Sequence, residues 1–172
     1  MKTVLTVAGS DPSGGAGIQA DIKTITAHGL YATSAITALT VQNTLGVSRV
    51  EPVPVDLVVQ QIDCVVGDIR PDAVKIGMLC NAEIVQAVAQ ALAHGQAECI
   101  VIDPVMISTS GHRLLDQEAV QWMKRKLFPM AQLITPNLPE AEALCGMRVR
   151  DEAEMERAAR LLSDQTGAAV LL

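Results

Sequence analysis

The stretch TVLTVAGSDPSGGAG, residues 3–17, joins an apolar segment to a glycine-rich turn and decides how the chain begins. Apolar and β-branched residues over Thr3–Ala8 predict a strand, and Gly14–His28 predicts a helix that Gly29 ends. Glycines in the turn let the backbone bend sharply and approach a ligand closely. A strand, a tight turn and a helix in this order form the first unit of an α/β fold.

Strands and helices alternate along the rest of the chain. The further strands are expected at Thr33–Val41, Val47–Val53, Ala73–Ile76, Ile100–Ile102, Leu133–Thr135 and Ala168–Leu172. The further helices are expected at Val55–Ile69, from Asn81 as the N-cap to Ala93, and at Asp116–Leu127, Leu138–Cys145 and Asp151–Gln165. Apolar strands separated by helices predict an α/β domain over residues 1–172, with a mostly parallel sheet and helices on both faces.

The last six residues, GAAVLL, have the composition of a buried strand and no polar tail follows them. We therefore expect the sequence to be the N-terminal portion of a longer, here incomplete, domain. The alternative is an edge strand at the true end of the chain.

Composition argues against several kinds of partner. The net charge of −6 disfavours nucleic acid and anionic membrane surfaces. No run approaches the ~20 apolar residues of a membrane span, and the first residues do not form a signal peptide. The four cysteines, at positions 64, 80, 99 and 145, lack metal-ligand spacing. We expect a cytoplasmic protein with reduced thiols that acts on a small molecule.

Polar or glycine residues follow each expected strand of the sheet. In open α/β sheets, ligands bind at the carboxyl ends of the strands. The residues at these ends are Gly9, Ser10 and Asp11, then Gln42 and Asn43, Gly77 and Met78, Asp103 and Pro104, and Pro136 and Asn137. An aspartate, two amides and glycine turns on one edge predict a ligand site there.

The glycine-rich turn has two interpretations. Its N–H groups and the following helix start favour an anion or a polar oxygen, but a tight turn also needs small residues for steric reasons alone. No Gly-Lys-Ser/Thr follows, so it is not a P-loop. The segment GAGIQA, residues 15–20, is similar to a dinucleotide fingerprint. A dinucleotide-dependent oxidoreductase is disfavoured, because Gln42 and Asn43 stand where an acidic residue should hold the ribose.

Two acidic positions could serve a metal–phosphate group. Asp103 directly follows a buried strand, and a carboxylate held there can bind Mg²⁺ directly or through water. Its alternative role is to form an Asp-Pro turn. Asn137 and Glu140 have the spacing of a helix capping box, and they would also stand at the sheet edge beside a phosphate. The local pattern allows both roles at once.

Five separated motifs together resemble one family of kinases. They are AGSDPSGGAGIQADIKT (residues 8–24), ALTVQNT (38–44), KIGML (75–79), DPVM (103–106) and TPNLPEA (135–141). Over its whole length the sequence resembles the hydroxymethylpyrimidine and phosphomethylpyrimidine kinases of thiamine biosynthesis, in the ribokinase superfamily. The resemblance implies a ribokinase-like three-layer α/β/α fold, with ATP and Mg²⁺ as cofactors. It also implies phosphorylation of 4-amino-5-hydroxymethyl-2-methylpyrimidine and then of its monophosphate to the pyrophosphate.

The same resemblance assigns roles to particular residues. The pyrimidine pocket would be lined by Gly9, Asp21, Gln42, Met78 and Val105. The Gln42 amide offers a donor and an acceptor to an aminopyrimidine edge. Asp103, Asn137 and Glu140 would lie near the ATP phosphates, with Asp103 and Glu140 as the Mg²⁺ ligands. A homodimer is implied for the full-length protein.

Family members continue past Leu172 with a Lys-Gly-Gly-His-like segment and a Gly-Thr-Gly-Cys turn that supplies the anion hole and activates the hydroxyl. No catalytic residue is therefore assigned within this sequence, and we expect the 172-residue chain alone to be inactive. Normal turnover in a phosphoryl-transfer assay would contradict that expectation. The alternatives are a pyridoxal or pyridoxine kinase of the same superfamily, which the stretch VQNT at 41–44 disfavours, and an inactive pyrimidine-binding fragment.

Overall fold

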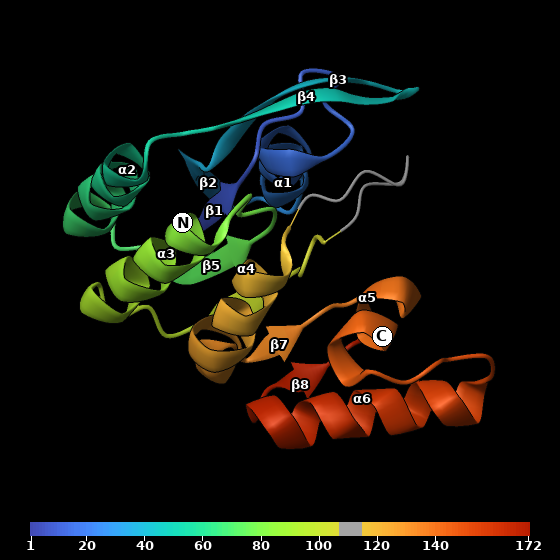
Figure 1. Cartoon of the computed structure of the whole chain (residues 1–172). Coiled ribbons are helices and arrows are strands. Elements are labelled where there is room, and N and C mark those ends of the chain that lie inside the picture. Colours follow the sequence, from blue (N-terminus) through green and yellow to red (C-terminus); the bar gives the residue numbers. More distant parts are fainter. Residues whose placement is uncertain (107–114) are drawn as a thin grey trace.

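Six strands form one parallel sheet at the centre of the computed structural model, which describes residues 1–106 and 115–172 (Figure 1). The sheet order is β2-β1-β5-β6-β7-β8, and the neighbouring pairs run parallel. The strands are β1 (Thr3–Ala8), β2 (Tyr31–Ile36), β5 (Ala73–Ile76), β6 (Ile100–Ile102), β7 (Leu133–Ile134) and β8 (Ala169–Val170). The parallel sheet that the sequence predicts is confirmed.

Helices connect these strands, close to the predicted ranges. They are α1 (Gly17–Ala27), α2 (Val55–Asp68), α3 (Ala82–His94), α4 (Gln117–Trp122), α5 (Leu138–Cys145) and α6 (Glu152–Thr166). After α4 the chain continues through a π-helical turn, Met123–Leu127, and a 3-10 turn, Phe128–Met130. The first helix starts three residues later than expected, because residues 14–16 belong to the glycine-rich turn.

The two faces of the sheet can be separated on β1. Leu5 and Val7 are fully buried in the core that includes side chains of α2 and α3. Thr6 lies between them and donates a hydrogen bond to Asp21 of α1, at 2.6 Å. Because successive side chains of a strand point to opposite faces, α1 covers the face opposite to α2 and α3. The fold therefore has the three layers that the sequence predicts.

A hairpin leaves the sheet where a single strand was expected. The predicted strand Thr33–Val41 is wrong: β2 ends at Ile36, and β3 (Ala38–Asn43) pairs antiparallel with β4 (Gly46–Pro52). The change of partner occurs at Thr37: its N–H still donates to the Ala8 carbonyl of β1, but its carbonyl accepts from the Val53 N–H after β4, and its hydroxyl donates to the Met78 carbonyl. Gln42 consequently lies within the projecting hairpin and not at the end of a sheet strand (Figure 1).

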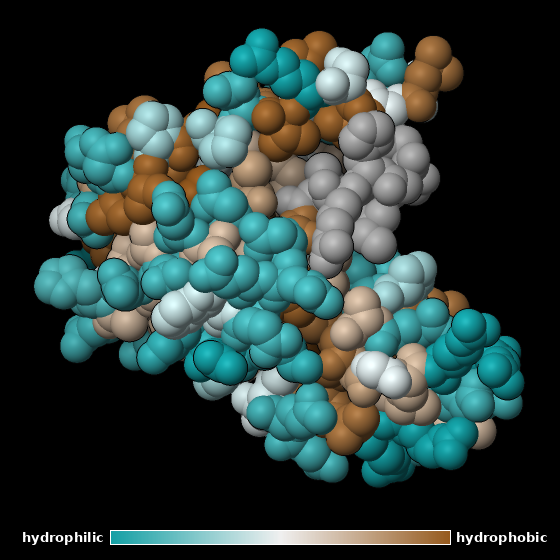
Figure 2. Space-filling model, in the orientation of Figure 1, coloured by the Kyte–Doolittle hydropathy of each residue, from teal (hydrophilic) through white to brown (hydrophobic). Residues whose placement is uncertain are grey.

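The outer face of the hairpin carries exposed apolar side chains beside a charged pair, because Leu39 lies opposite Glu51 and Val41 opposite Arg49. Leu39 and Val41 are more than half exposed, and Leu45 at the hairpin tip is 89% exposed. Figure 2 shows hydrophobic atoms at the surface over this hairpin. None of the helices within the described residues is both long enough and apolar enough to cross a membrane.

Candidate active site

A cavity of about 740 Å³ opens at the carboxyl edge of the sheet, next to the hairpin. Its walls come from the glycine-rich turn, α1, the hairpin, the ends of β5 and β6, and the start of α5. The cavity brings together all eight site residues named from the sequence: Gly9, Asp21, Gln42, Met78, Asp103, Val105, Asn137 and Glu140. The structure thus gathers them at one site, and their individual roles stay predictions.

The glycine-rich turn is organised around the carboxylate of Asp11, which is 2% exposed. This carboxylate accepts hydrogen bonds from the Ser13 N–H and hydroxyl, the Gly15 N–H and the Ala16 N–H, at 2.7 to 3.1 Å. Burial raises the pKa of Asp11, but these hydrogen bonds outweigh it and the pKa is lowered. Since Asp11 already occupies these N–H groups, the hydrogen bonds support the structural interpretation of the turn, not an anion site at this helix start.

Close packing explains two of the glycines in this turn. A Cβ atom at Gly17 would lie 2.3 Å from the carbonyl oxygen of Gly9, and Gly17 has a φ of +56°. A Cβ atom at Gly9 would lie 2.4 Å from the Cε atom of Met78. The contact at Gly17 is with backbone and excludes a side chain there, whereas a side chain at Gly9 would require the flexible end of Met78 to move. The turn therefore packs directly against the cavity wall that Met78 forms.

The hairpin holds Gln42 over the cavity. The Ser10 N–H donates to the Ala38 carbonyl at 2.8 Å, and the Thr40 hydroxyl donates to the Ser10 carbonyl at 2.7 Å. Thr40, Gln42 and Val47 line the cavity, while Val41 points to the outer face of the same strand. Within the part of the chain that the structure describes, the Gln42 side chain makes no hydrogen bond, so its amide can pair with a ligand.

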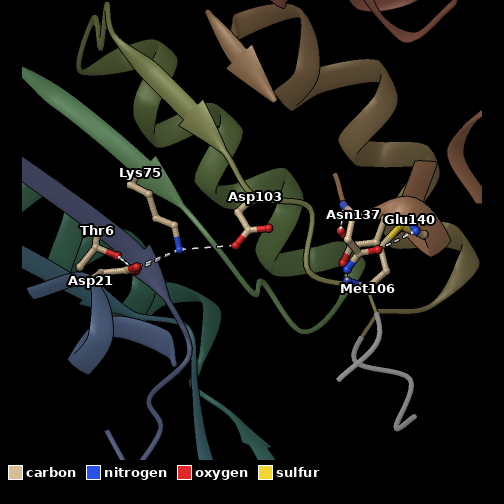
Figure 3. Close-up of polar contacts among 7 residues, drawn as sticks. All are labelled: Thr6, Asp21, Lys75, Asp103, Met106, Asn137 and Glu140. Atoms are coloured by element: carbon tan, nitrogen blue, oxygen red, sulfur yellow. Dashed lines mark hydrogen bonds and ion pairs between the residues drawn. The ribbon is translucent and has the colours of Figure 1, made fainter. Parts of the chain in front are cut away.

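Lys75 is a charged residue of the cavity that was not assigned a role from the sequence. Its Nζ atom lies 3.0 Å from Oδ1 of Asp21 and 3.9 Å from Oδ2 of Asp103 (Figure 3). The pKa of Asp103 is raised, mainly by burial. The ammonium of Lys75 lowers this pKa, and the negative charge of Asp21 raises it further. One available signal was a lysine inside the short apolar strand AVKI, residues 73–76.

Asn137 and Glu140 form a complete capping box at the start of α5. The Asn137 side chain accepts from the Glu140 N–H at 2.9 Å, and Oε2 of Glu140 accepts from the Asn137 N–H at 3.0 Å. Oε1 of Glu140 accepts from the Met106 N–H at 3.2 Å, so the side chain also ties α5 to the loop after β6 (Figure 3). Burial raises the pKa of Glu140, whereas the bonds from Asn137 and Met106 lower it and Asp103 raises it further.

Comparison with known proteins identifies the family. Residues 11–172 match the family described as phosphomethylpyrimidine kinase. The chain belongs to this family. The hydroxymethylpyrimidine/phosphomethylpyrimidine kinases of Haemophilus influenzae and Escherichia coli are 48% and 49% identical to it; the matches cover 100% of this chain and 64% and 66% of those proteins. A bifunctional thiamine biosynthesis protein of Geobacter sulfurreducens is 52% identical, over 93% of this chain and 33% of that protein. The chain therefore spans between about a third and two thirds of these relatives.

Solved structures of related kinases have the same fold as this chain. The phosphomethylpyrimidine kinase of Clostridium difficile 630 is 44% identical, with a TM-score of 0.90 over 99% of this chain and 74% of that one. Pyridoxal kinase from Staphylococcus aureus, in complex with pyridoxal, is 34% identical, with a TM-score of 0.87 over 99% of this chain and 63% of that one. The ribokinase-like α/β fold expected from the sequence is confirmed.

Proposed function

We propose that the protein serves the ATP-dependent phosphorylation of 4-amino-5-hydroxymethyl-2-methylpyrimidine and of its monophosphate, for thiamine biosynthesis. The observation that carries the proposal is the shared cavity, whose lining includes every residue expected at the pyrimidine and every residue expected at the phosphates. Relatives of about 48% identity that are named for this activity support the proposal.

The pyrimidine would occupy the side of the cavity under the hairpin. Its ring needs apolar walls, which Met78, Val47 and Val105 supply. Its amino group and adjacent ring nitrogen form a donor–acceptor pair, which matches the available amide of Gln42. Gly9 would let the ring approach the backbone of the turn.

The phosphates would occupy the other side, near Asp103, Asn137 and Glu140. Mg²⁺ usually binds one or two carboxylates and keeps water or phosphate oxygens as its other ligands. The site fits this mode, because the Asp103 side chain is 40% exposed and leaves room for water or phosphate oxygens. Asp103 would hold the ion, and Glu140, whose two oxygens already accept N–H bonds, would act through water. Bound Mg²⁺ supplies charge neutralisation to the phosphates.

Phosphoryl transfer requires mainly positioning and neutralisation of charge, and these residues provide the positioning. The sheet fixes Asp103, and the capping box fixes Glu140 relative to Asn137. The Asn137 oxygen is used in the cap, so its NH₂ group is the part that could donate to a phosphate oxygen.

Pyridoxal is the second candidate substrate, because the pyridoxal kinase of Staphylococcus aureus has a TM-score of 0.87 to this chain. Calorimetric titration with the pyrimidine, its monophosphate and pyridoxal separates the two functions. We expect the pyrimidine to bind at least about tenfold more tightly than pyridoxal, which corresponds to about 1.4 kcal/mol. Tighter binding of pyridoxal would transfer the proposal to the vitamin B6 kinases. No pyrimidine binding by a chain that unfolds cooperatively in urea would reject the pyrimidine assignment.

We also infer that the protein associates as a homodimer. The exposed apolar side chains of the hairpin, Leu39, Val41 and Leu45, support this inference. Light scattering after size-exclusion chromatography should give twice the chain mass of 18.2 kDa. A mass that stays at one chain across micromolar concentrations would contradict it.

A further inference from the structure

Lys75 occupies an unusual place for a lysine. Its neighbours Val74 and Ile76 are buried in the core, so the alternation of a strand turns Lys75 to the opposite face, where α1 lies. Its side chain is only 26% exposed. Among the described residues that line the cavity, Lys75 is the one cationic side chain. A buried ammonium is unfavourable without partners, so its surroundings must compensate for it.

The surroundings of Lys75 are built for its ammonium group. Nζ lies within 3.1 Å of both carboxylate oxygens of Asp21, and Thr6 donates to Oδ2 of the same carboxylate (Figure 3). The Asp103 carboxylate faces the ammonium from the next strand, at 3.9 Å. Gly77 leaves room for this arrangement, because a Cβ atom there would lie 3.0 Å from Nζ.

The two carboxylates belong to different ends of the proposed site. Asp21 is expected at the pyrimidine, and Asp103 at the phosphates. Like charges on one wall repel each other, and a cation between them offsets the repulsion and favours this arrangement. Three separate elements, α1, β5 and the end of β6, supply the three charges.

We propose that Lys75 is a positioning residue, which holds the carboxylates of Asp21 and Asp103 on one wall of the cavity and thereby sets the pyrimidine end relative to the phosphate end. The assignment of these ends rests on the proposed function. Lys75 acts through the two carboxylates and is not itself expected to touch the reacting atoms.

The test is a double-mutant cycle on pyrimidine binding by calorimetry. Lys75→Met, Asp21→Asn and the double variant are compared with Lys2→Met, which breaks an exposed lysine–aspartate pair with Asp72 away from the cavity. We expect Lys75→Met to weaken pyrimidine binding about tenfold and Lys2→Met to change it less than about twofold. In the Asp21→Asn background, Lys75→Met should weaken binding by clearly less than tenfold, because only the contact of Lys75 with Asp103 is then lost. Losses that multiply, or no loss in Lys75→Met, would overturn the proposal.

A second cycle uses urea unfolding and needs no ligand, so it separates this proposal from the proposed function. Lys75→Met and Asp21→Asn should each lower the urea midpoint, and the double variant should lower it by clearly less than the sum of the two. Midpoint losses that add fully would show that the two side chains are independent, and would overturn the proposal even if the wild type binds no pyrimidine. If the wild type binds no pyrimidine but the coupling is present, the proposed function fails and the holding role of Lys75 stands.

Discussion

Glu140→Gln tests the finding that Glu140 ties two parts of the site together. The buried carboxylate accepts one N–H at each oxygen, from Met106 at 3.2 Å and from Asn137 at 3.0 Å. Glutamine keeps one acceptor oxygen, which can serve only one of these two N–H groups. Its NH₂ group then faces the second N–H, so two donors meet and neither is satisfied. Hydrogen bonds to a charged group contribute about 1.5–3 kcal/mol, and an unsatisfied buried N–H costs about 1–3 kcal/mol.

One effect works in the other direction. Burial raises the pKa of Glu140, which means that the charged form is disfavoured, and the neutral glutamine removes that penalty. We therefore expect a net loss of about 2 kcal/mol in the free energy of unfolding, less than the two costs added together, because the removed penalty offsets part of them. Urea denaturation at pH 7.5, followed by far-ultraviolet circular dichroism, measures this loss.

Glu154→Gln is the matched control. Oε2 of Glu154 accepts the Arg150 N–H at 2.8 Å near the start of α6, but in an exposed setting. Water can satisfy the freed N–H there, so the expected loss is below about 1 kcal/mol. If Glu140→Gln loses no more stability than Glu154→Gln, the tie between α5 and the loop after β6 does not stabilise the fold, and our reasoning about Glu140 is refuted.

Two further substitutions probe the glycine-rich turn. Asp11→Asn should lower the free energy of unfolding by about 2 kcal/mol at pH 7. Because folding lowers the pKa of Asp11, the difference in stability between wild type and variant should become smaller as the pH falls below the ordinary value of 3.8. Urea midpoints measured between pH 7 and 3 check this. A difference that does not depend on pH would contradict it. Gly17→Ala should lower the free energy of unfolding by about 3 kcal/mol or more, since its Cβ would clash with the Gly9 carbonyl oxygen. The control is Gly67→Ala within α2, where no atom lies near the added Cβ. It should raise the free energy of unfolding by about 0.5–1 kcal/mol in the same assay. Equal effects of the two alanines would argue against the close packing of the turn.

Local patterns predicted the elements that depend on neighbours in sequence. The spacing of Asn137 and Glu140 gave a capping box, and Asn81 was expected as the N-cap of α3, where its side chain accepts the Ile84 N–H. The break at Thr37 was missed because its partners, Ala8 and Met78, are distant in sequence. A run of β-branched residues favours a strand on both sides of such a break, so no local signal marks it.

In the site too, local patterns predicted some features, and contacts between distant residues determined the others. The carboxyl ends of parallel strands predicted that Gly9, Met78 and Asp103 meet at one edge, and they do. The turn was ambiguous, because only the folded structure shows that Asp11 takes its N–H groups. Lys75 was overlooked, although strand alternation places it on the face that Thr6 and α1 share.

The most direct test of the account is the affinity of the pyrimidine for Gln42→Ala, with Val41→Ala as the control from the opposite face of the same strand. Gln42 lines the cavity, whereas Val41 is 58% exposed on the outer face. Calorimetry should show binding weakened about tenfold or more in Gln42→Ala, as expected when a specific amide pair is lost, and unchanged within about twofold in Val41→Ala. Equal affinities for wild type and Gln42→Ala would contradict the claim that this cavity recognises an aminopyrimidine.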